Sequence, residues 1–124
     1  MLKKIMVIDD EPDLLLLVSC SLDNRGYEIF GGGDGREALA LALRLMPDLM
    51  ILDVNLPRMN GDEVARIFKN DEKMKHIPVV LISSVTEGLK EKAEKSGADA
   101  YLSKPFELEE FVALVKKFCE PARP

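Results

Sequence analysis

Apolar runs of strand length alternate with longer helical segments along the chain, and turn-forming residues separate them. The expected strands cover residues 4–9, 27–30, 49–53, 78–83 and 100–103, and the expected helices cover 11–26, 36–45, a segment that starts near 60, 86–96 and 107–119. Right-handed crossovers place each such helix over the sheet. The pattern therefore predicts an α/β fold, a single (βα)5 unit with a doubly wound parallel sheet and helices on both faces.

Four segments have residue patterns that fit more than one local structure. Residues 38–45 alternate like a strand, but they are Ala, Leu and Arg, which favour helix, and Pro47 supplies a stop. The run 14–17, four leucines, fills more than one helical face and predicts a deeply buried helix, with an exposed partner groove as the alternative. Residues 31–35 are rich in glycine but lack nucleotide-binding spacings, so they predict a strand-to-helix turn. Gly88 falls in the first turn of the helix expected at 86–96 and weakens it.

Composition limits the classes of function. The length of 124 residues suits one domain, which we assign to 1–120, with 121–124 as a C-terminal tail or a truncated linker. A net charge of -5 argues against direct nucleic-acid binding. No apolar run is long enough for a membrane span and no signal peptide is evident, so a cytoplasmic protein without a membrane partner is expected. Cys20 and Cys119 lack a CxxC spacing and are expected to be buried and reduced.

Three carboxylates fall at the carboxyl ends of two expected strands. Asp9 and Asp10 end the first strand and Asp53 ends the third. Ligands of such sheets bind at this edge. Crowded carboxylates repel one another unless a proton or a metal ion holds them, so the spacing predicts Mg²⁺, with Asn55 offering its backbone carbonyl as a further ligand.

The same edge gathers two more polar groups. Ser83 ends the fourth strand and Lys104 follows the fifth. A carboxylate can accept a phosphoryl group when a metal ion and a cation neutralise the transferring oxygens. Asp53 is the expected nucleophile.

This constellation resembles the receiver domain of bacterial two-component response regulators, and the resemblance covers Lys4 to Cys119. The residues that carry it are Asp9, Asp10, Asp53, Asn55, Pro57, Met59, Gly61, Ser83, Tyr101, Lys104, Pro105 and Phe106. The resemblance implies a flavodoxin-like fold with strand order 2-1-3-4-5. It also implies that Asp9 and Asp10 bind Mg²⁺, that Asp53 accepts phosphate from a histidine kinase or a histidine phosphotransferase, and that Ser83 and Lys104 contact the phosphoryl oxygens.

The resemblance further implies a switch. Ser83 would couple to the side chain of Tyr101, and the surface of the fourth helix, fifth strand and fifth helix would change for a downstream protein target. A phosphorylation-dependent homodimer through that surface stays open. The resemblance also implies a cis peptide bond between Lys104 and Pro105. The chain departs only mildly from the family pattern, with Ser84 where alanine or glycine is usual. Val85 places an apolar side chain where a polar one could position water, which predicts slow self-dephosphorylation.

Other functions remain as alternatives. A degenerate receiver would bind proteins without phosphorylation. An aspartate-nucleophile phosphatase of the haloacid-dehalogenase type would need an acid where Asn55 stands. A flavodoxin-like FMN protein would meet repulsion from the acids after the first strand. We therefore expect no enzyme beyond assistance to its own phosphorylation and dephosphorylation, and the chain is either a stand-alone regulator or a receiver from a longer one.

Overall fold

The computed structural model describes residues 2–22 and 25–120, so the tail expected at 121–124 lies outside the described residues. The parallel strands form one sheet in the order β2-β1-β3-β4-β5, which confirms the predicted α/β class and strand order. The elements in chain order are β1 (Lys3–Ile8), α1 (Pro12–Leu22), β2 (Tyr27–Gly32), α2 (Gly35–Leu45), β3 (Leu49–Asp53), α3 (Gly61–Lys69), β4 (Val79–Ser83), α4 (Leu89–Ser96), β5 (Ala100–Ser103) and α5 (Leu108–Phe118).

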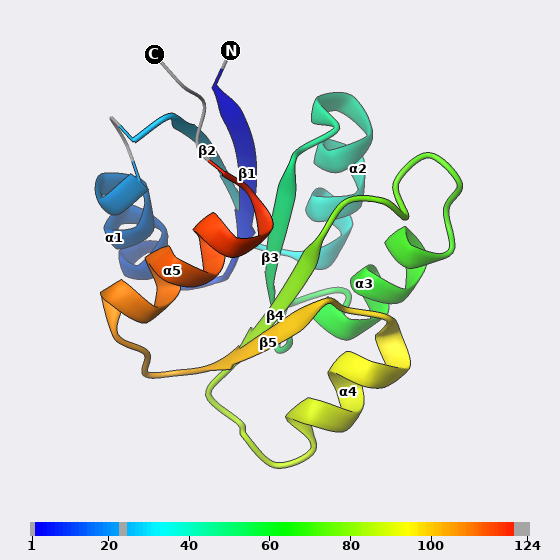
Figure 1. Cartoon of the computed structure of the whole chain (residues 1–124). Coiled ribbons are helices and arrows are strands. Elements are labelled where there is room, and N and C mark those ends of the chain that lie inside the picture. Colours follow the sequence, from blue (N-terminus) through cyan, green and yellow to red (C-terminus); the bar gives the residue numbers. More distant parts are fainter. Residues whose placement is uncertain (1, 23–24, 121–124) are drawn as a thin grey trace.

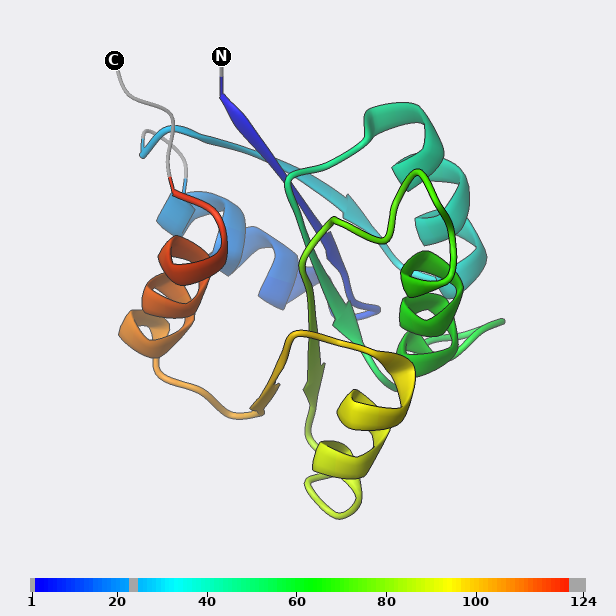
Figure 2. The ribbon, with the colours of Figure 1, turned by 45° about the vertical axis from the view of Figure 1, so that its right-hand side comes forward.

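Side chains that alternate along the strands build a core on each face of the sheet. On β1, Ile5 packs in the cluster that contains Phe111 of α5, and the next residue, Met6, packs in the cluster that contains Phe68 of α3. Figures 1 and 2 show α1 and α5 on one face and α2, α3 and α4 on the other. Because both faces of the central strands are covered, ligand groups are left to the strand ends.

The Ala-Leu segment is a helix, as predicted. The carboxylate of Asp34 caps α2 by accepting a hydrogen bond from the backbone N–H of Glu37 at 2.8 Å. Ala38 and Ala42, one turn apart, are buried, while Met46 ends the helix in the left-handed conformation with φ 48°. Helix propensity therefore prevails over the two-residue alternation of this segment.

The prediction that the leucine run of α1 is deeply buried is wrong. The side chains of Leu16 and Leu17 are 65% and 50% exposed, whereas Val18 and Leu22 are fully buried. A helix on one face of a sheet turns only one stripe toward the core, so leucines outside that stripe remain at the surface. The described helix α1 covers Pro12–Leu22, and Arg25 and Gly26 form a turn, although the expected helix extended to Gly26.

Glycine accounts for two further differences. Gly88 adopts the left-handed conformation, with φ 76°, so α4 starts after it at Leu89 and not at residue 86. Gly31 and Gly32 continue β2, where a turn was expected. Both cysteines are free, but Cys20 is exposed and only Cys119 is buried.

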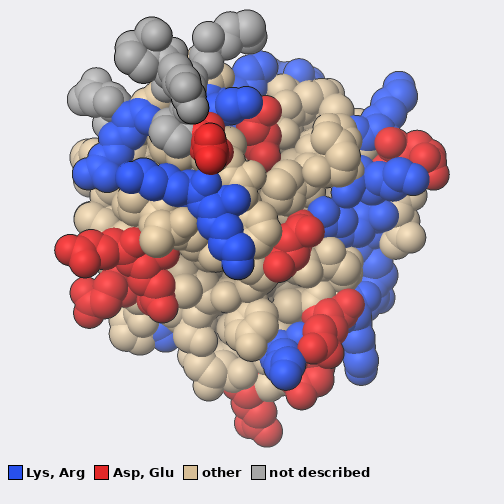
Figure 3. All heavy atoms as spheres, in the orientation of Figure 1, with Lys and Arg blue, Asp and Glu red and all other residues tan. Residues whose placement is uncertain are grey.

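The described surface carries charges of both signs. Figure 3 shows acidic and basic side chains distributed over the side of the molecule that Figure 1 presents. On α5 the acids Glu109 and Glu110 occupy the first turn and the bases Lys116 and Lys117 the last, which complements the helix dipole. Among the described helices, none has the length and apolarity that crossing a membrane requires.

Candidate functional site

Two central strands bring the first acids together. Strands β1 and β3 are neighbours, and Ile8 pairs with Leu52 in their register. Asp9 and Asp53 follow these paired residues, so both emerge at the same edge of the sheet. They are buried, at 1% and 5% exposure, whereas Asp10 is exposed on the loop. A pair of buried carboxylates without a counterion would be strongly unfavourable, so the site requires a cation.

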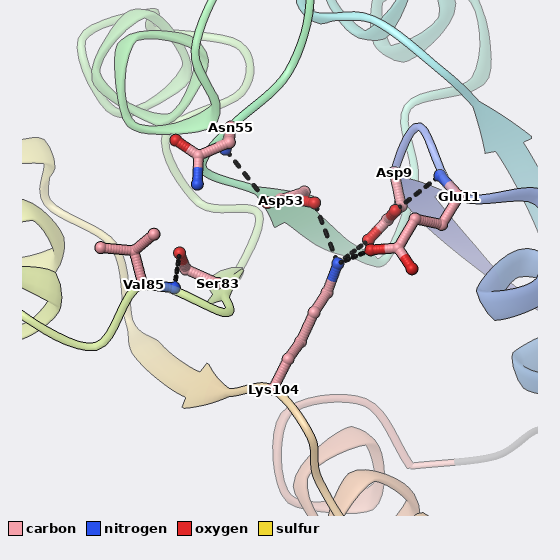
Figure 4. A network of polar contacts seen from close by, with 7 residues as sticks. All are labelled: Asp9, Glu11, Asp53, Asn55, Ser83, Val85 and Lys104. Carbon is pink, nitrogen blue, oxygen red and sulfur yellow. Dashed lines mark hydrogen bonds and ion pairs between the residues drawn. The ribbon is translucent and has the colours of Figure 1, made fainter.

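The side chain of Lys104 supplies that cation in this structure. Its Nζ lies 2.7 Å from Asp9 Oδ2, 3.0 Å from Asp53 Oδ2 and 3.0 Å from Glu11 Oε1. Figure 4 shows the ammonium reaching from the end of β5 into the middle of these acids. An ammonium has three donor hydrogens, so all of its donors have carboxylate partners.

Local turns orient the two buried carboxylates. The second oxygen of Asp9 accepts a hydrogen bond from the N–H of Glu11 at 2.8 Å, and the second oxygen of Asp53 accepts one from the N–H of Asn55 at 3.0 Å. Both bonds join a side chain to the backbone two residues later, a turn that aspartate forms readily. Each carboxylate is therefore held at one oxygen by the backbone and at the other by Lys104.

The loop after β3 depends on glycine. A Cβ atom at Gly61 would collide with the backbone carbonyl of Asp53. The N–H of Gly61 donates to the carbonyl of Val54 at 2.9 Å, so α3 starts in contact with the end of β3. Gly61 therefore fixes the backbone beside Asp53.

Ser83 and Lys104 come from neighbouring strands. The backbone N–H of Lys104 donates to the carbonyl of Ser83 at 2.8 Å, and the Lys104–Pro105 bond is cis, the isomer that the resemblance implied. The hydroxyl of Ser83 is buried and accepts a hydrogen bond from the N–H of Val85 at 3.0 Å. In Figure 4 this hydroxyl is directed toward Val85.

Tyr101 lies on the edge strand β5 with its side chain 43% exposed. It pairs with Leu81, and Ser103, two residues later, pairs with Ser83. Alternation along a strand puts Tyr101 and Ser103 on the same face of the sheet. The aromatic ring is thus turned to the surface, two strand positions from the Ser83 pair.

Burial and the ion pairs change the acidity of the central groups. Burial raises the pKa of Asp9, and the nearby charge of Asp53 adds to the rise, although hydrogen bonds from Lys104 and from the Glu11 backbone oppose it. Burial lowers the pKa of Lys104, but the hydrogen bonds to Asp9, Asp53 and Glu11 outweigh that effect and place it above its usual value. Lys104 therefore remains a cation at neutral pH.

The acid cluster suits a hard divalent cation. Asp9, Asp10, Glu11 and Asp53 each offer a carboxylate oxygen, and these oxygens lie within 4.8 Å of one another. Mg²⁺ prefers oxygen ligands and tolerates few carboxylates, completing its shell with water. The predicted residues Asp9, Asp10 and Asp53 thus fit the ion. The sequence reasoning missed Glu11, although its position directly after the acid pair was a usable signal.

A comparison with protein families agrees with this geometry. Residues 5–116 match the model of the response regulator receiver domain. The chain therefore belongs to the response regulator receiver domain family.

Individual relatives show the same kinship. The chain is 34% identical over 119 residues to the polar-differentiation response regulator DivK of Brucella ovis, covering 95% of this chain and 97% of DivK. It is 39% identical over 115 residues to the DNA-binding dual master transcriptional regulator RpaA of Synechocystis sp., covering 91% of this chain and 47% of RpaA. The fold matches the chemotaxis response regulator CheY4 of Vibrio cholerae with a TM-score of 0.87 at 31% identity, covering 95% and 99% of the two chains.

Family and site together define the class of function. The chain is a receiver domain of two-component signalling, and its pocket of Asp9, Asp10 and Asp53 is compatible with Mg²⁺ and with acceptance of a phosphoryl group. The fold and the family were both predicted from the sequence. The alternatives of a phosphatase and of a flavin protein are not favoured by these relatives.

Proposed function

We propose that Asp53 accepts a phosphoryl group from a phosphohistidine of a sensor histidine kinase or a histidine phosphotransferase. A carboxylate oxygen of Asp53 attacks phosphorus, a P–O bond forms, and the P–N bond to the imidazole breaks with its electron pair passing to nitrogen. The observation that carries the proposal is the convergence of the Asp53 and Asp9 carboxylates within hydrogen-bond distance of the Lys104 ammonium. A carboxylate so placed is both oriented and close to a cation.

The other site residues support the transfer. The ammonium of Lys104 stands at the end of a long side chain that starts directly after β5, so it would exchange carboxylate partners for the phosphoryl oxygens as negative charge develops on them. The hydroxyl of Ser83, at the end of β4, would donate a hydrogen bond to a phosphoryl oxygen once it turns from Val85. Both groups act on charge that grows during the reaction.

Mg²⁺ would be held by the carboxylates of Asp9, Asp10 and Asp53 and by the backbone carbonyl of Asn55. When bound, it would neutralise negative charge on the Asp53 carboxylate and on the phosphoryl oxygens. The turns that fix Asp9 and Asp53 reduce the cost of ordering these ligands. These assignments rest on the donor set and on the family.

The readout would be a change of surface. Movement of Ser83 toward the phosphoryl group would alter the space beside Tyr101, whose ring is exposed in this structure. The face of α4, β5 and α5 would then bind a downstream protein target, with a homodimer through the same face as the alternative. Family membership supports this assignment, a receiver domain over residues 1–120, and action in the cytoplasm without turnover of an external substrate.

Intact mass after incubation with Mg²⁺ and phosphoramidate tests the proposal. We expect one phosphoryl adduct on the wild type and none on Asp53→Asn. Asp48→Asn is the matched control, because Asp48 is exposed at the opposite end of the same strand and should leave the adduct intact. A wild type that takes no adduct from phosphoramidate or acetyl phosphate would establish the degenerate receiver instead.

A further inference from the structure

Glu11 is the member of the acid cluster that the proposed function does not use. Its Oε1 accepts a hydrogen bond from Lys104 Nζ at 3.0 Å. Its side chain is 64% exposed, whereas that of Asp9, on the same ammonium, is completely buried. Figure 4 shows the Glu11 carboxylate next to that of Asp9, and both are directed toward the Lys104 ammonium. Glu11 thus lies at the mouth of the site, in contact with its cation.

The three partners of Lys104 are not equivalent. Two of them, Asp9 and Asp53, are buried and belong to the proposed ligands of the divalent cation, whereas Glu11, whose oxygen lies in the same cluster, is exposed and is not one of those ligands. A cation bound to these oxygens withdraws them from Lys104 and repels the ammonium. Glu11 is then the one remaining acceptor among the three that Lys104 uses in this structure.

We propose that Glu11 is a positioning residue that holds Lys104 beside the site while a divalent cation occupies Asp9 and Asp53, and releases it to the phosphoryl group. This inference rests on the proposed function of Asp53. The side chain of Glu11 makes no contact with the phosphoryl group in this scheme. It acts only through the ammonium.

The proposal predicts two opposite effects for Glu11→Gln. The glutamine keeps the size of the side chain but loses the charge, so the cation-loaded resting site loses its ion pair. Binding of Mg²⁺ should weaken about two- to fivefold, the range for a partly exposed ion pair. At saturating Mg²⁺ the phosphorylation rate should rise by about the same factor, because Lys104 no longer leaves a charged partner to reach the phosphoryl group.

A direct observation of the ammonium distinguishes this role from its rivals. The ¹⁵N–¹H signal of a lysine ammonium is observable when hydrogen bonds slow its exchange with water, and Lys104→Met identifies the signal. In Mg²⁺-saturated wild type the Lys104 signal should persist, and in Mg²⁺-saturated Glu11→Gln it should vanish. If Glu11 were instead a ligand of the cation, Mg²⁺ would remove the signal from the wild type.

A general effect of charge on the anionic donor is the other rival. Glu107→Gln is the matched control, because the substitution removes the same charge as Glu11→Gln. Glu107 is exposed just before α5 and lies at the same edge of the sheet. Simple repulsion would give a similar acceleration in both variants. It would also give a larger gain with acetyl phosphate than with the less charged phosphoramidate.

The results divide cleanly. Faster phosphorylation of Glu11→Gln alone, equal for both donors, together with loss of its ammonium signal in Mg²⁺, supports the proposal. The proposal is overturned if Glu11→Gln is phosphorylated at an unchanged or slower rate at saturating Mg²⁺. It is also overturned if the ammonium signal persists in Mg²⁺-saturated Glu11→Gln, or if Mg²⁺ removes that signal from the wild type. A wild type that takes no phosphoryl group refutes the proposed function of Asp53, and the ammonium signal still decides the role of Glu11.

Discussion

Replacing Lys104 by methionine tests the idea that its ammonium holds the acid site together. Methionine keeps most of the side-chain volume and removes the charge. The variant would leave Asp9 and Asp53 buried beside each other, with Asp10 and Glu11 close by and no ammonium between them. We expect a clear loss of folding stability in the absence of divalent cations.

The magnitude follows from the contact geometry. Ammonium-carboxylate contacts of 2.7 and 3.0 Å are worth about 6 kcal/mol each at an effective dielectric constant of about 20. Desolvation offsets much of this gain, because Lys104 is only 13% exposed and Asp9 is fully buried. Removing one partner of a buried pair typically costs about 3–5 kcal/mol. We expect Lys104→Met to lower the free energy of unfolding by about 3 kcal/mol, at the low end of this range, because the aspartates can relax toward water on the side where Glu11 is exposed.

Urea unfolding with a metal chelator, and then with excess MgCl₂, measures this effect. A ligand present at 100 times its dissociation constant adds about 2.7 kcal/mol of stability, so Mg²⁺ should recover most of the loss. Lys92→Met, on the exposed side of α4, is the control and should change stability by less than about 0.5 kcal/mol. A Lys104→Met protein that is as stable as the wild type without Mg²⁺ would refute the placement of the ammonium as the counterion.

Three further predictions concern other parts of the molecule. Gly61→Ala should lower the free energy of unfolding by about 2–3 kcal/mol and impair phosphorylation, because the added methyl group meets the Asp53 carbonyl. An unchanged midpoint of urea unfolding would contradict this prediction. The phosphoryl adduct should persist for minutes or longer, and Val85→Asn should shorten its life when adduct mass is followed after donor removal; a wild-type half-life of seconds would argue against the role of Val85. Tyr27→Phe loses a 2.6 Å hydrogen bond to the Cys119 carbonyl and should cost about 1 kcal/mol at pH 7. Burial raises the pKa of Tyr27 from 10.0 to about 12, so the unfolded wild type loses the phenolic proton at a lower pH than the folded wild type. The difference in free energy of unfolding between the wild type and Tyr27→Phe should therefore shrink from pH 10 to about pH 12. A difference that stays constant over this range would contradict the role of the buried hydroxyl.

The sequence was sufficient for the fold and for the place of the site. Five strand-length apolar segments between helical ones indicate a parallel sheet whose strand ends share one edge. That the acids after β1 and at the end of β3 meet also requires these strands to be neighbours, an order that the resemblance implied and the structure confirms. The roles of Asp9 and Asp53 as ligand and acceptor rest on chemistry and family membership, which the geometry supports.

The burial of α1 could not be predicted from its composition. Leucine in a helix indicates burial only when the facing element is known, and four in a row exceed the stripe that one sheet can cover. In the structure Leu14 and Leu15 are half-buried while Leu16 and Leu17 are exposed. The division depends on how the helix is rotated about its axis, which α5 and β2 determine.

Glu11 was missed for a related reason. Its backbone position follows from the strand, but its contact depends on the torsions of two flexible side chains, its own and that of Lys104. These torsions are fixed by where the ammonium finds three acceptors at once. Only the assembled site brings Glu11 within 3.0 Å of a lysine 93 positions away.

Charge at the site and the shape of the surface are linked through one stretch of backbone. The ammonium of Lys104 neutralises Asp9 and Asp53 at rest, and the N–H of the same residue donates to the carbonyl of Ser83. Tyr101 lies three residues before Lys104, on the edge strand β5, where one side has no neighbouring strand to restrain it. The proposed exchange of partners by the ammonium would therefore act on the backbone that positions both members of the proposed switch. The proposed role of Glu11 would then extend, through the Lys104 ammonium, to the surface that Ser83 and Tyr101 shape.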